Sequence, residues 1–255
     1  MTSKTTLLDV VVIRKTRISE NDLVFCMVAN DSRIINAIGK SARKPGNTFS
    51  NRLDLFNVAH ISLASTRGLG IIREATLIET HKNIHNNFSL MTCASAISEL
   101  VWRLTFSENT NEALFDFLIK TFFLIDTKCE KSKEIALAAL IKLLAMEGFG
   151  PAYKFCSLCG RPLQKATSSN NFVTFSPDSG GFLCDECAKT DLSSIKKIAF
   201  KDSILSNFNN LLNLTYEQII DLNSISEKDI FDLKKLLQLW IERVTSHKNN
   251  SLELL

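Results

Sequence analysis

The chain has 255 residues, of which 45% are hydrophobic, enough for at least two compact units with their own cores. Its seven cysteines are too few for a disulfide scaffold and indicate a reducing compartment. No targeting leader opens the chain, and the longest nearly apolar stretch, residues 135–146, is too short to cross a bilayer. The sequence therefore predicts a soluble, cytoplasmic protein without a membrane partner.

The net charge of +3 is unevenly distributed along the chain. Residues 1–80 carry 11 Lys and Arg against 7 Asp and Glu, whereas residues 81–255 carry 19 against 20. The excess of positive charge therefore lies in the first third of the sequence.

Five short segments rich in Val, Ile and Leu are predicted to be strands, because turn-forming clusters separate them. They are residues 6–14, 23–29, 33–38, 58–65 and 70–79. This number of strands fits a small closed barrel. A five-stranded barrel of the OB type binds oligonucleotides on its middle strands and long loops, although the spacing does not distinguish it from an SH3-like barrel.

A basic stretch lies within this region, since residues 32–53 contain five basic residues and no acidic one. The five are Arg33, Lys40, Arg43, Lys44 and Arg52. Lys and Arg beside a polyanion release condensed counterions, so the stretch is a candidate DNA-binding surface; a loop that merely faces water is the alternative. Phe49 is the one aromatic candidate for stacking on a base, and the alternative is that it closes the barrel end.

After residue 79 the apolar period changes from two to about 3.6, which predicts helices. Three apolar faces, within residues 90–104, 114–125 and 137–144, are followed by further helical patterns at residues 204–212 and 230–244. Gly148 and Pro151 predict that the third helix ends near Glu147. We expect Trp240 to be a packing residue, His81 and His85 to lie on the surface at a helix start, and Cys26, Cys93 and Cys129 to be small core residues.

Two Cys-x2-Cys pairs, Cys156 with Cys159 and Cys184 with Cys187, have the spacing of a four-sulfur metal site. A complete set of four thiolates leaves no open position for a substrate, so we expect one structural Zn²⁺ per chain. Iron remains an alternative, and two redox-active Cys-x2-Cys couples are a weaker one because no βαβ context surrounds them. The turns and short strand between the pairs predict a small module without its own hydrophobic core, whose folding energy comes from the metal.

The predicted fold class is therefore multidomain α+β: an N-terminal five-stranded OB-fold β-barrel, then an α-helical domain interrupted by a four-cysteine zinc finger. The predicted domains are residues 1–80 for the barrel, 81–152 and 191–247 for the two parts of the helical domain, 153–190 for the zinc finger, and 248–255 for a flexible C-terminus.

Several short motifs follow one another in an informative order. They are Ser19-Glu20-Asn21-Asp22-Leu23, Lys40-Ser41-Ala42-Arg43-Lys44, Arg52-Leu53-Asp54-Leu55-Phe56, Gly68-Leu69-Gly70 leading to Glu74-Ala75, and Gly148-Phe149-Gly150-Pro151 followed by Cys156-Ser157-Leu158-Cys159-Gly160. In this order and spacing the chain resembles the RecO family of bacterial DNA repair and recombination mediators along nearly its whole length. It departs from the family at Ser41, where Gly is common, and at Leu55, where Pro is common.

The resemblance implies a mediator of the RecF pathway type. Proteins similar to this one bind single- and double-stranded DNA, anneal complementary strands and associate with RecR. They also bind the acidic C-terminal tail of single-stranded DNA-binding protein, and so help to load RecA on single strands. The resemblance further implies a bacterial cytoplasmic protein that is associated with the nucleoid when it acts.

Two other classes of function compete with this interpretation. A metal-dependent nuclease is the enzyme alternative, but the sequence lacks a phosphate-binding Gly-x4-Gly-Lys loop, a His-Glu-x2-His motif and a Gly-x-Ser-x-Gly motif. We therefore expect no enzymatic activity. An RNA-binding protein of transcription or translation is the nearer alternative, because composition alone does not separate DNA from RNA binding.

Overall fold

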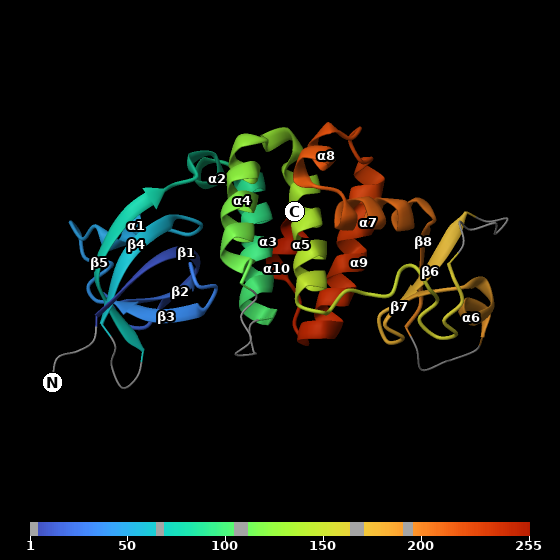
Figure 1. The fold of residues 1–255 in the computed structure, drawn as a ribbon, viewed down its shortest axis with the longest axis horizontal. Coiled ribbons are helices and arrows are strands. Elements are labelled where there is room, and N and C mark those ends of the chain that lie inside the picture. The colour runs from blue at the N-terminus through green and yellow to red at the C-terminus, as the bar shows by residue number, and fades with distance from the viewer. Residues whose placement is uncertain (1–4, 65–68, 105–111, 164–170, 191–195) are drawn as a thin grey trace. The chain divides into compact units, whose positions relative to one another are not determined.

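The computed structural model describes residues 5–64, 69–104, 112–163, 171–190 and 196–255 (Figure 1). The chain divides into two compact units, Met1–Ser132 and Lys133–Leu255. The barrel thus shares its unit with the first two long helices, whereas the cysteine pairs belong to the second unit.

The first unit begins with five strands, as predicted, and each ends within three residues of its expected bounds. They are β1 (Thr5–Arg17), β2 (Leu23–Ala29), β3 (Ile34–Gly39), β4 (Val58–Ala64) and β5 (Gly70–Glu79). The sheet closes in the order β1-β2-β3-β5-β4 (Figure 1). Among the described strand pairings of this sheet, the short β3–β5 pairing alone is parallel.

The barrel core follows from the alternation of side chains along each strand. Val10, Val12, Phe25 and Met27 point inward and are fully buried. A short helix, α1 (Phe49–Arg52), lies in the connection between β3 and β4. Phe49 packs against the barrel core, which favours its role in closing the barrel over stacking on a base.

The outer face of β1 is also covered, and for this reason every residue from Val10 to Ile13 is buried. The covering helices are α3 (Phe88–Leu104) and α4 (Leu114–Thr127), the latter followed by the 3-10 turn η1 (Cys129–Lys131). Cys26 and Cys93 are buried as expected, but the prediction for Cys129 was wrong: it begins the exposed turn η1.

His81 also departs from the prediction, since it is 1% exposed rather than on the surface. It precedes the short helix α2 (Lys82–Asn86), which packs against α3 and α4. Its ring lies edge-on to Phe122, with 6.3 Å between the centroids. Burial lowers the pKa of His81 below its ordinary value, against the opposing charges of Glu79 and Asp126. A neutral histidine therefore occupies the core of this unit.

All of α5 (Ser132–Met146) except its first residue belongs to the second unit, and the helix ends where the sequence predicted. Gly148 adopts φ +79°, a left-handed conformation that a glycine tolerates best. The Phe149 N–H donates to the Leu144 carbonyl at 2.7 Å and the Gly148 N–H donates to the Ala145 carbonyl at 3.1 Å. This pair of bonds is the Schellman helix ending, and it turns the chain towards the cysteine pairs.

A three-stranded sheet of order β7-β6-β8 carries the cysteine region. It consists of β6 (Phe172–Ser176), β7 (Gly181–Leu183) and β8 (Ile198–Lys201), with the short helix α6 (Asp185–Lys189) after β7. Four helices follow: α7 (Ser203–Asn213), α8 (Tyr216–Asp221), α9 (Glu227–Thr245) and α10 (Asn250–Leu254).

The small sheet has a hydrophobic core, contrary to expectation. Phe175 and Phe182 are fully buried and pack edge to face at 5.0 Å. The rings of Trp240 on α9 and Phe175 pack edge to face, with 6.0 Å between their centroids. The Trp240 indole N–H donates to the Phe149 carbonyl at 2.7 Å. The packing role predicted for Trp240 is thus confirmed, and the metal is not the only source of folding energy for this region.

The last residues form a packed helix rather than an extended tail. The Asn249 side chain accepts a hydrogen bond from the Leu252 N–H at 2.9 Å, which caps α10. Leu252 is buried against the rest of the unit. None of the described helices is both long and apolar enough to cross a membrane.

Candidate metal centre and nucleic-acid interface

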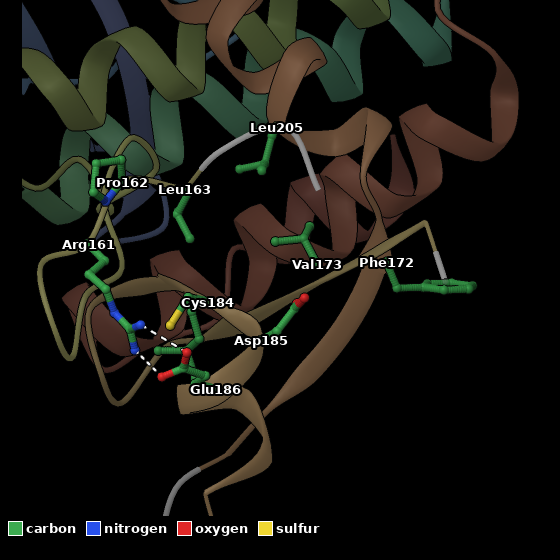
Figure 2. A pocket seen from close by; sticks show the side chains of 10 residues that line it. Arg161, Pro162, Leu163, Phe172, Val173, Cys184, Asp185, Glu186 and Leu205 are labelled. Atoms are coloured by element: carbon green, nitrogen blue, oxygen red, sulfur yellow. Dashed lines mark hydrogen bonds and ion pairs between the residues drawn. The ribbon is translucent and has the colours of Figure 1, made fainter. Parts of the chain in front are cut away.

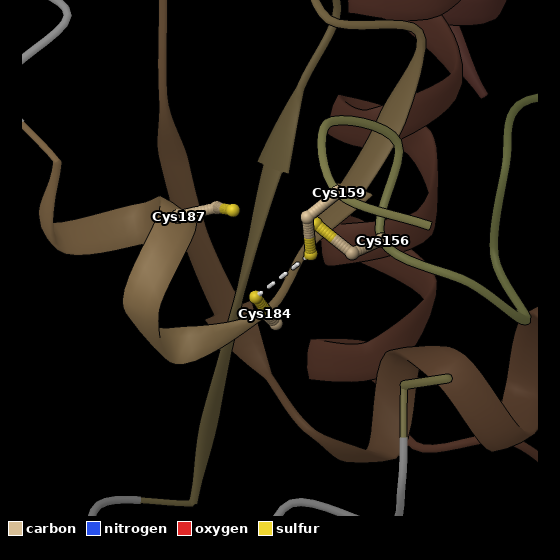
Figure 3. Close-up of side chains that lie close together, drawn as sticks. All are labelled: Cys156, Cys159, Cys184 and Cys187. Carbon is tan, nitrogen blue, oxygen red and sulfur yellow. Dashed lines mark hydrogen bonds between the residues drawn. The ribbon is translucent and has the colours of Figure 1, made fainter. Parts of the chain in front are cut away.

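The first cysteine pair lies on a tight turn. The Cys156 N–H donates to the Arg161 carbonyl at 2.7 Å, and the Gly160 N–H donates back to the Cys156 carbonyl at 2.9 Å. Gly160 has φ +72°, so the turn closes without a strained side chain. This geometry directs Cys156 and Cys159 towards one point (Figure 3).

The second pair sits at the start of α6. Cys184 is the residue immediately before the helix, and its carbonyl accepts from the Ala188 N–H at 2.8 Å. Cys187, one turn further, then faces the same point as Cys184 (Figure 3).

The four sulfur atoms lie within 4.8 Å of one another, and the sulfurs of Cys159 and Cys184 are 3.7 Å apart. A tetrahedral ion with metal–sulfur bonds of about 2.3 Å requires sulfurs about 3.8 Å apart. The residues therefore fit a four-coordinate metal ion, and they leave no position for a substrate.

The thiol pKa values are split, as expected where several sulfurs share one place. The Arg161 side chain, which donates to Cys159, lowers the pKa of that thiol to about 6, whereas hydrogen bonding to Cys184 and burial raise the pKa of Cys187 to about 12. Burial opposes ionisation of Cys156, but backbone hydrogen bonds outweigh it and lower its pKa. All four sulfurs ionise together only if a cation offsets their charge.

One ion pair joins the two halves of this centre. Arg161 follows the first pair, and its Nη1 donates to Oε1 of Glu186 on α6 at 3.0 Å, while its second amino group contacts Oε2 (Figure 2). Its Nε donates to the sulfur of Cys159 at 3.4 Å. A cavity of about 390 Å³, lined partly by Arg161, Glu186 and Phe172, lies beside this contact.

The basic loop after β3 is held against the turn between β1 and β2. The Ser41 N–H donates to the Asp22 carboxylate at 2.7 Å, and the Arg43 N–H donates to the Asn21 carbonyl at 3.0 Å. Arg43 Nη1 also donates to the Glu20 carbonyl at 2.9 Å. The two segments therefore form one ordered surface at this end of the barrel.

Three of the five predicted DNA-binding residues, Lys40, Arg43 and Lys44, lie on this surface and are exposed. The Lys44 N–H donates to the Ser41 carbonyl at 2.9 Å, but in the part of the chain that the structure describes neither the Lys40 nor the Lys44 ammonium group has a partner. Arg52 is exposed too, but its Nη1 donates to the Ala75 carbonyl on β5 at 2.8 Å. The cluster Lys40, Arg43 and Lys44 is called the cationic loop below.

Arg33 is not part of the cationic loop. It precedes β3, whereas Lys40 follows that strand, so about 20 Å of extended chain separates the two residues. Its Nε donates to the Asp31 carboxylate at 2.8 Å, which neutralises its charge.

Arg17 is not among the five predicted DNA-binding residues, yet it lies beside them. Of the basic residues on β1, Arg14 stacks over Trp102 at 3.6 Å and Lys15 pairs with Asp54. Arg17 is exposed at the end of the strand, beside the turn that holds the cationic loop. The pairing of Arg17 with Leu23 across β1 and β2 places Arg17 next to the turn that contacts the cationic loop.

The comparisons with known proteins point to one family. A family model described as Recombination protein O C terminal matches residues 85–253. A DNA repair protein RecO from Dehalococcoides mccartyi is 30% identical over 185 residues, which cover 71% of this chain and 69% of that protein. DNA repair proteins RecO from Symbiobacterium thermophilum and Bacillus cereus are each 27% identical, over 70% and 71% of this chain respectively and 70% of each relative.

The family model covers most of the chain, and the resemblance seen in the sequence motifs is confirmed; within those motifs Gly68 lies outside the described residues. The alignment with the Dehalococcoides mccartyi protein extends over more than two thirds of both chains. The chain therefore belongs to the RecO family.

Proposed function

We propose that this protein is a non-enzymatic DNA-binding protein of repair and recombination, which holds single- and double-stranded DNA by its phosphates at the barrel. The observation that carries the proposal is the cationic loop, where hydrogen bonds fix the backbone and leave Lys40 and Lys44 exposed. The relatives support it, since they carry the name DNA repair protein. The strand order of the barrel, with β3 and β5 parallel, supports an OB-type barrel.

The mechanism follows from electrostatics. Phosphates that contact Lys40, Arg43 and Lys44 release condensed counterions, so binding gains free energy without reading the base sequence. The same charges lower the repulsion between two approaching strands, and base pairing then joins them. Strand annealing of this kind requires no nucleoside triphosphate.

We assign to the four cysteines one structural Zn²⁺ ion per chain. The sulfur spacing supports this assignment, and the complete set of ligands argues against a catalytic metal. When bound, the ion offsets the thiolate charges and ties the Cys156–Cys159 turn to α6. Metal analysis of the purified protein distinguishes zinc from iron, which the same ligands would accept.

The partners we propose come from membership of the family. They are RecR and the C-terminal tail of single-stranded DNA-binding protein, with RecA reached indirectly, in a RecF-type pathway. This assignment places the protein in the bacterial cytoplasm, associated with the nucleoid when it acts.

Annealing of two complementary oligonucleotides, with and without single-stranded DNA-binding protein, tests this function. The variant K40E/K44E should anneal naked strands at least about tenfold more slowly, because each reversal replaces a phosphate contact with a repulsion. A matched control is K82E/K248E, which makes the same change of charge at exposed lysines outside the cationic loop.

An equal decrease of the annealing rate in K40E/K44E and K82E/K248E would show that net charge, not the cationic loop, drives annealing, and would refute the proposal. Full activity in K40E/K44E would refute it as well. Stronger binding to a matched RNA than to the DNA would favour the RNA-binding alternative.

A further inference from the structure

The outer face of the barrel beside the cationic loop is aliphatic. The strand register places Thr16 opposite Val24, Val24 opposite Ile38, and Ile38 opposite Ile71. The next residues along β2, β3 and β5 are Phe25, Ala37 and Ile72, which point into the core. Because side chains alternate between the two faces, Val24, Ile38 and Ile71 face outward.

These three side chains are only half-buried. Two further aliphatic residues adjoin these strands: Ile18, directly after β1, is 50% exposed, and Leu69, directly before β5, is 45% exposed. Together the five residues form the aliphatic strip: Ile18, Val24, Ile38, Leu69 and Ile71. Its three central residues are direct neighbours across the paired strands β2, β3 and β5, since Val24 lies opposite Ile38 and Ile38 opposite Ile71.

Charge borders the aliphatic strip on one side. Lys40 is exposed in the turn directly after β3, two residues beyond Ile38, and the exposed Arg17 adjoins Ile18. Two carboxylates lie in the adjoining turn: Asp22, which accepts the Ser41 N–H at 2.7 Å, and the exposed Glu20. An apolar surface with a cationic border suits a ligand that joins apolar faces to a chain of negative charges, which describes single-stranded nucleic acid.

No Phe, Tyr or Trp side chain is exposed among the described residues of the barrel, and the exposed His60 of β4 pairs with Asp9. Phe25 and Phe56 are 0% and 1% exposed, and Phe49 packs against the core. Stacking on aromatic rings, the usual way in which such barrels hold bases, is therefore not offered by the described surface.

We propose that the bases of a bound single strand lie on the aliphatic strip while their phosphates follow the cationic loop. This proposal rests on the proposed function and specifies its ligand contacts. Aliphatic side chains offer neither hydrogen bonds nor ring stacking, so the contact does not discriminate between bases. The pairing edges of the bases remain available, which is what a second, complementary strand requires.

The test compares two ligands of equal charge: a thymidine oligonucleotide and an oligonucleotide of the same length whose residues all lack bases. The wild type should bind the thymidine ligand about tenfold more tightly, measured by fluorescence anisotropy. Ile38→Ser should weaken binding of the thymidine ligand about fivefold and leave binding of the abasic ligand unchanged. Ile71→Ser should do the same, which guards against misfolding of a single variant.

The control is Leu7→Ser, which removes an aliphatic side chain that is 64% exposed on β1, opposite Ser62 of β4 and away from the aliphatic strip. It should change neither affinity. Equal wild-type affinity for the two ligands would overturn the proposal, and so would wild-type binding of the thymidine ligand by both Ile38→Ser and Ile71→Ser. Either result would favour a protein partner for the aliphatic strip. In that case weak binding of both ligands by K40E/K44E would still uphold the proposed function, whereas unchanged binding by K40E/K44E would refute that function itself.

Discussion

Replacing Gly181 with Ala should be unusually destabilising for the addition of one methyl group. A Cβ at this position would lie 2.3 Å from the carbonyl oxygen and 2.7 Å from the nitrogen of Ala152. Both are backbone atoms, so neither a rotamer change nor a small side-chain shift relieves the clash. The Ala152 N–H donates to the Gly180 carbonyl and the Phe182 N–H donates to the Ala152 carbonyl, each at 2.9 Å, and the substitution forces these strands apart.

The expected loss is about 3 kcal/mol of unfolding free energy. Each of the two hydrogen bonds contributes about 1 kcal/mol, and the strained backbone adds about another 1 kcal/mol. The neighbouring Gly180 is the matched control, because it has φ +88° but nothing within 4 Å of an added Cβ. Gly180→Ala should therefore cost only about 1 kcal/mol, from conformation alone.

Urea unfolding followed by tryptophan fluorescence measures both losses. The chain has two tryptophans, so a Trp102→Phe background leaves Trp240, which packs on the small sheet, as the single reporter of the second unit. If Gly181→Ala costs no more than Gly180→Ala, the close approach of Ala152 does not constrain this position and the reasoning fails.

Three further predictions concern the cysteines, a buried histidine and the cationic loop. Cys156→Ser should release about one metal ion per chain in elemental analysis and lower the urea midpoint of the second unit; a variant that retains its metal would contradict the assignment. Because burial lowers the folded-state pKa of His81, the unfolded chain takes up its proton first, so the first unit should lose stability as pH falls below about 6.5. His81→Gln should flatten that dependence when urea midpoints at pH 5 and 7.5 are compared, and an unchanged slope would exclude His81 as its cause. Ser41 has φ +56°, so Ser41→Gly should keep the loop intact, whereas Ser41→Val should cost about 1–2 kcal/mol and weaken DNA binding; equal binding by the two variants would count against a fixed loop conformation.

The regular patterns of the sequence were sufficient for most of the fold. The apolar residues of the five strands and the long helices recur with a clear period, which predicts these elements. The end of α5 was predicted because a left-handed cap favours glycine, and Gly148 is at that position. Short elements such as α8 and β8 were not predicted, because four to six residues are too few to show a periodic pattern of apolar residues. The burial of His81 was missed because it depends on how α2 packs on α4.

The candidate sites show the same division between local and distant information. The spacing of the four cysteines in the sequence was enough to predict that they cluster, because each pair lies on a single turn. The Arg161–Glu186 contact joins residues 25 positions apart, which spacing does not reveal. Arg33 was grouped with the cationic loop because residues 32–53 hold no acid, yet its partner Asp31 lies one residue before that range.

The most direct test of the central claim is the salt dependence of single-strand binding. If Lys40 and Lys44 each contact a phosphate, the slope of log affinity against log salt for K40E/K44E should be shallower than that of the wild type by about 1.4, or about 0.7 for each lost contact. The K82E/K248E control should keep the wild-type slope. An unchanged slope in K40E/K44E, with its fold intact, would contradict the account.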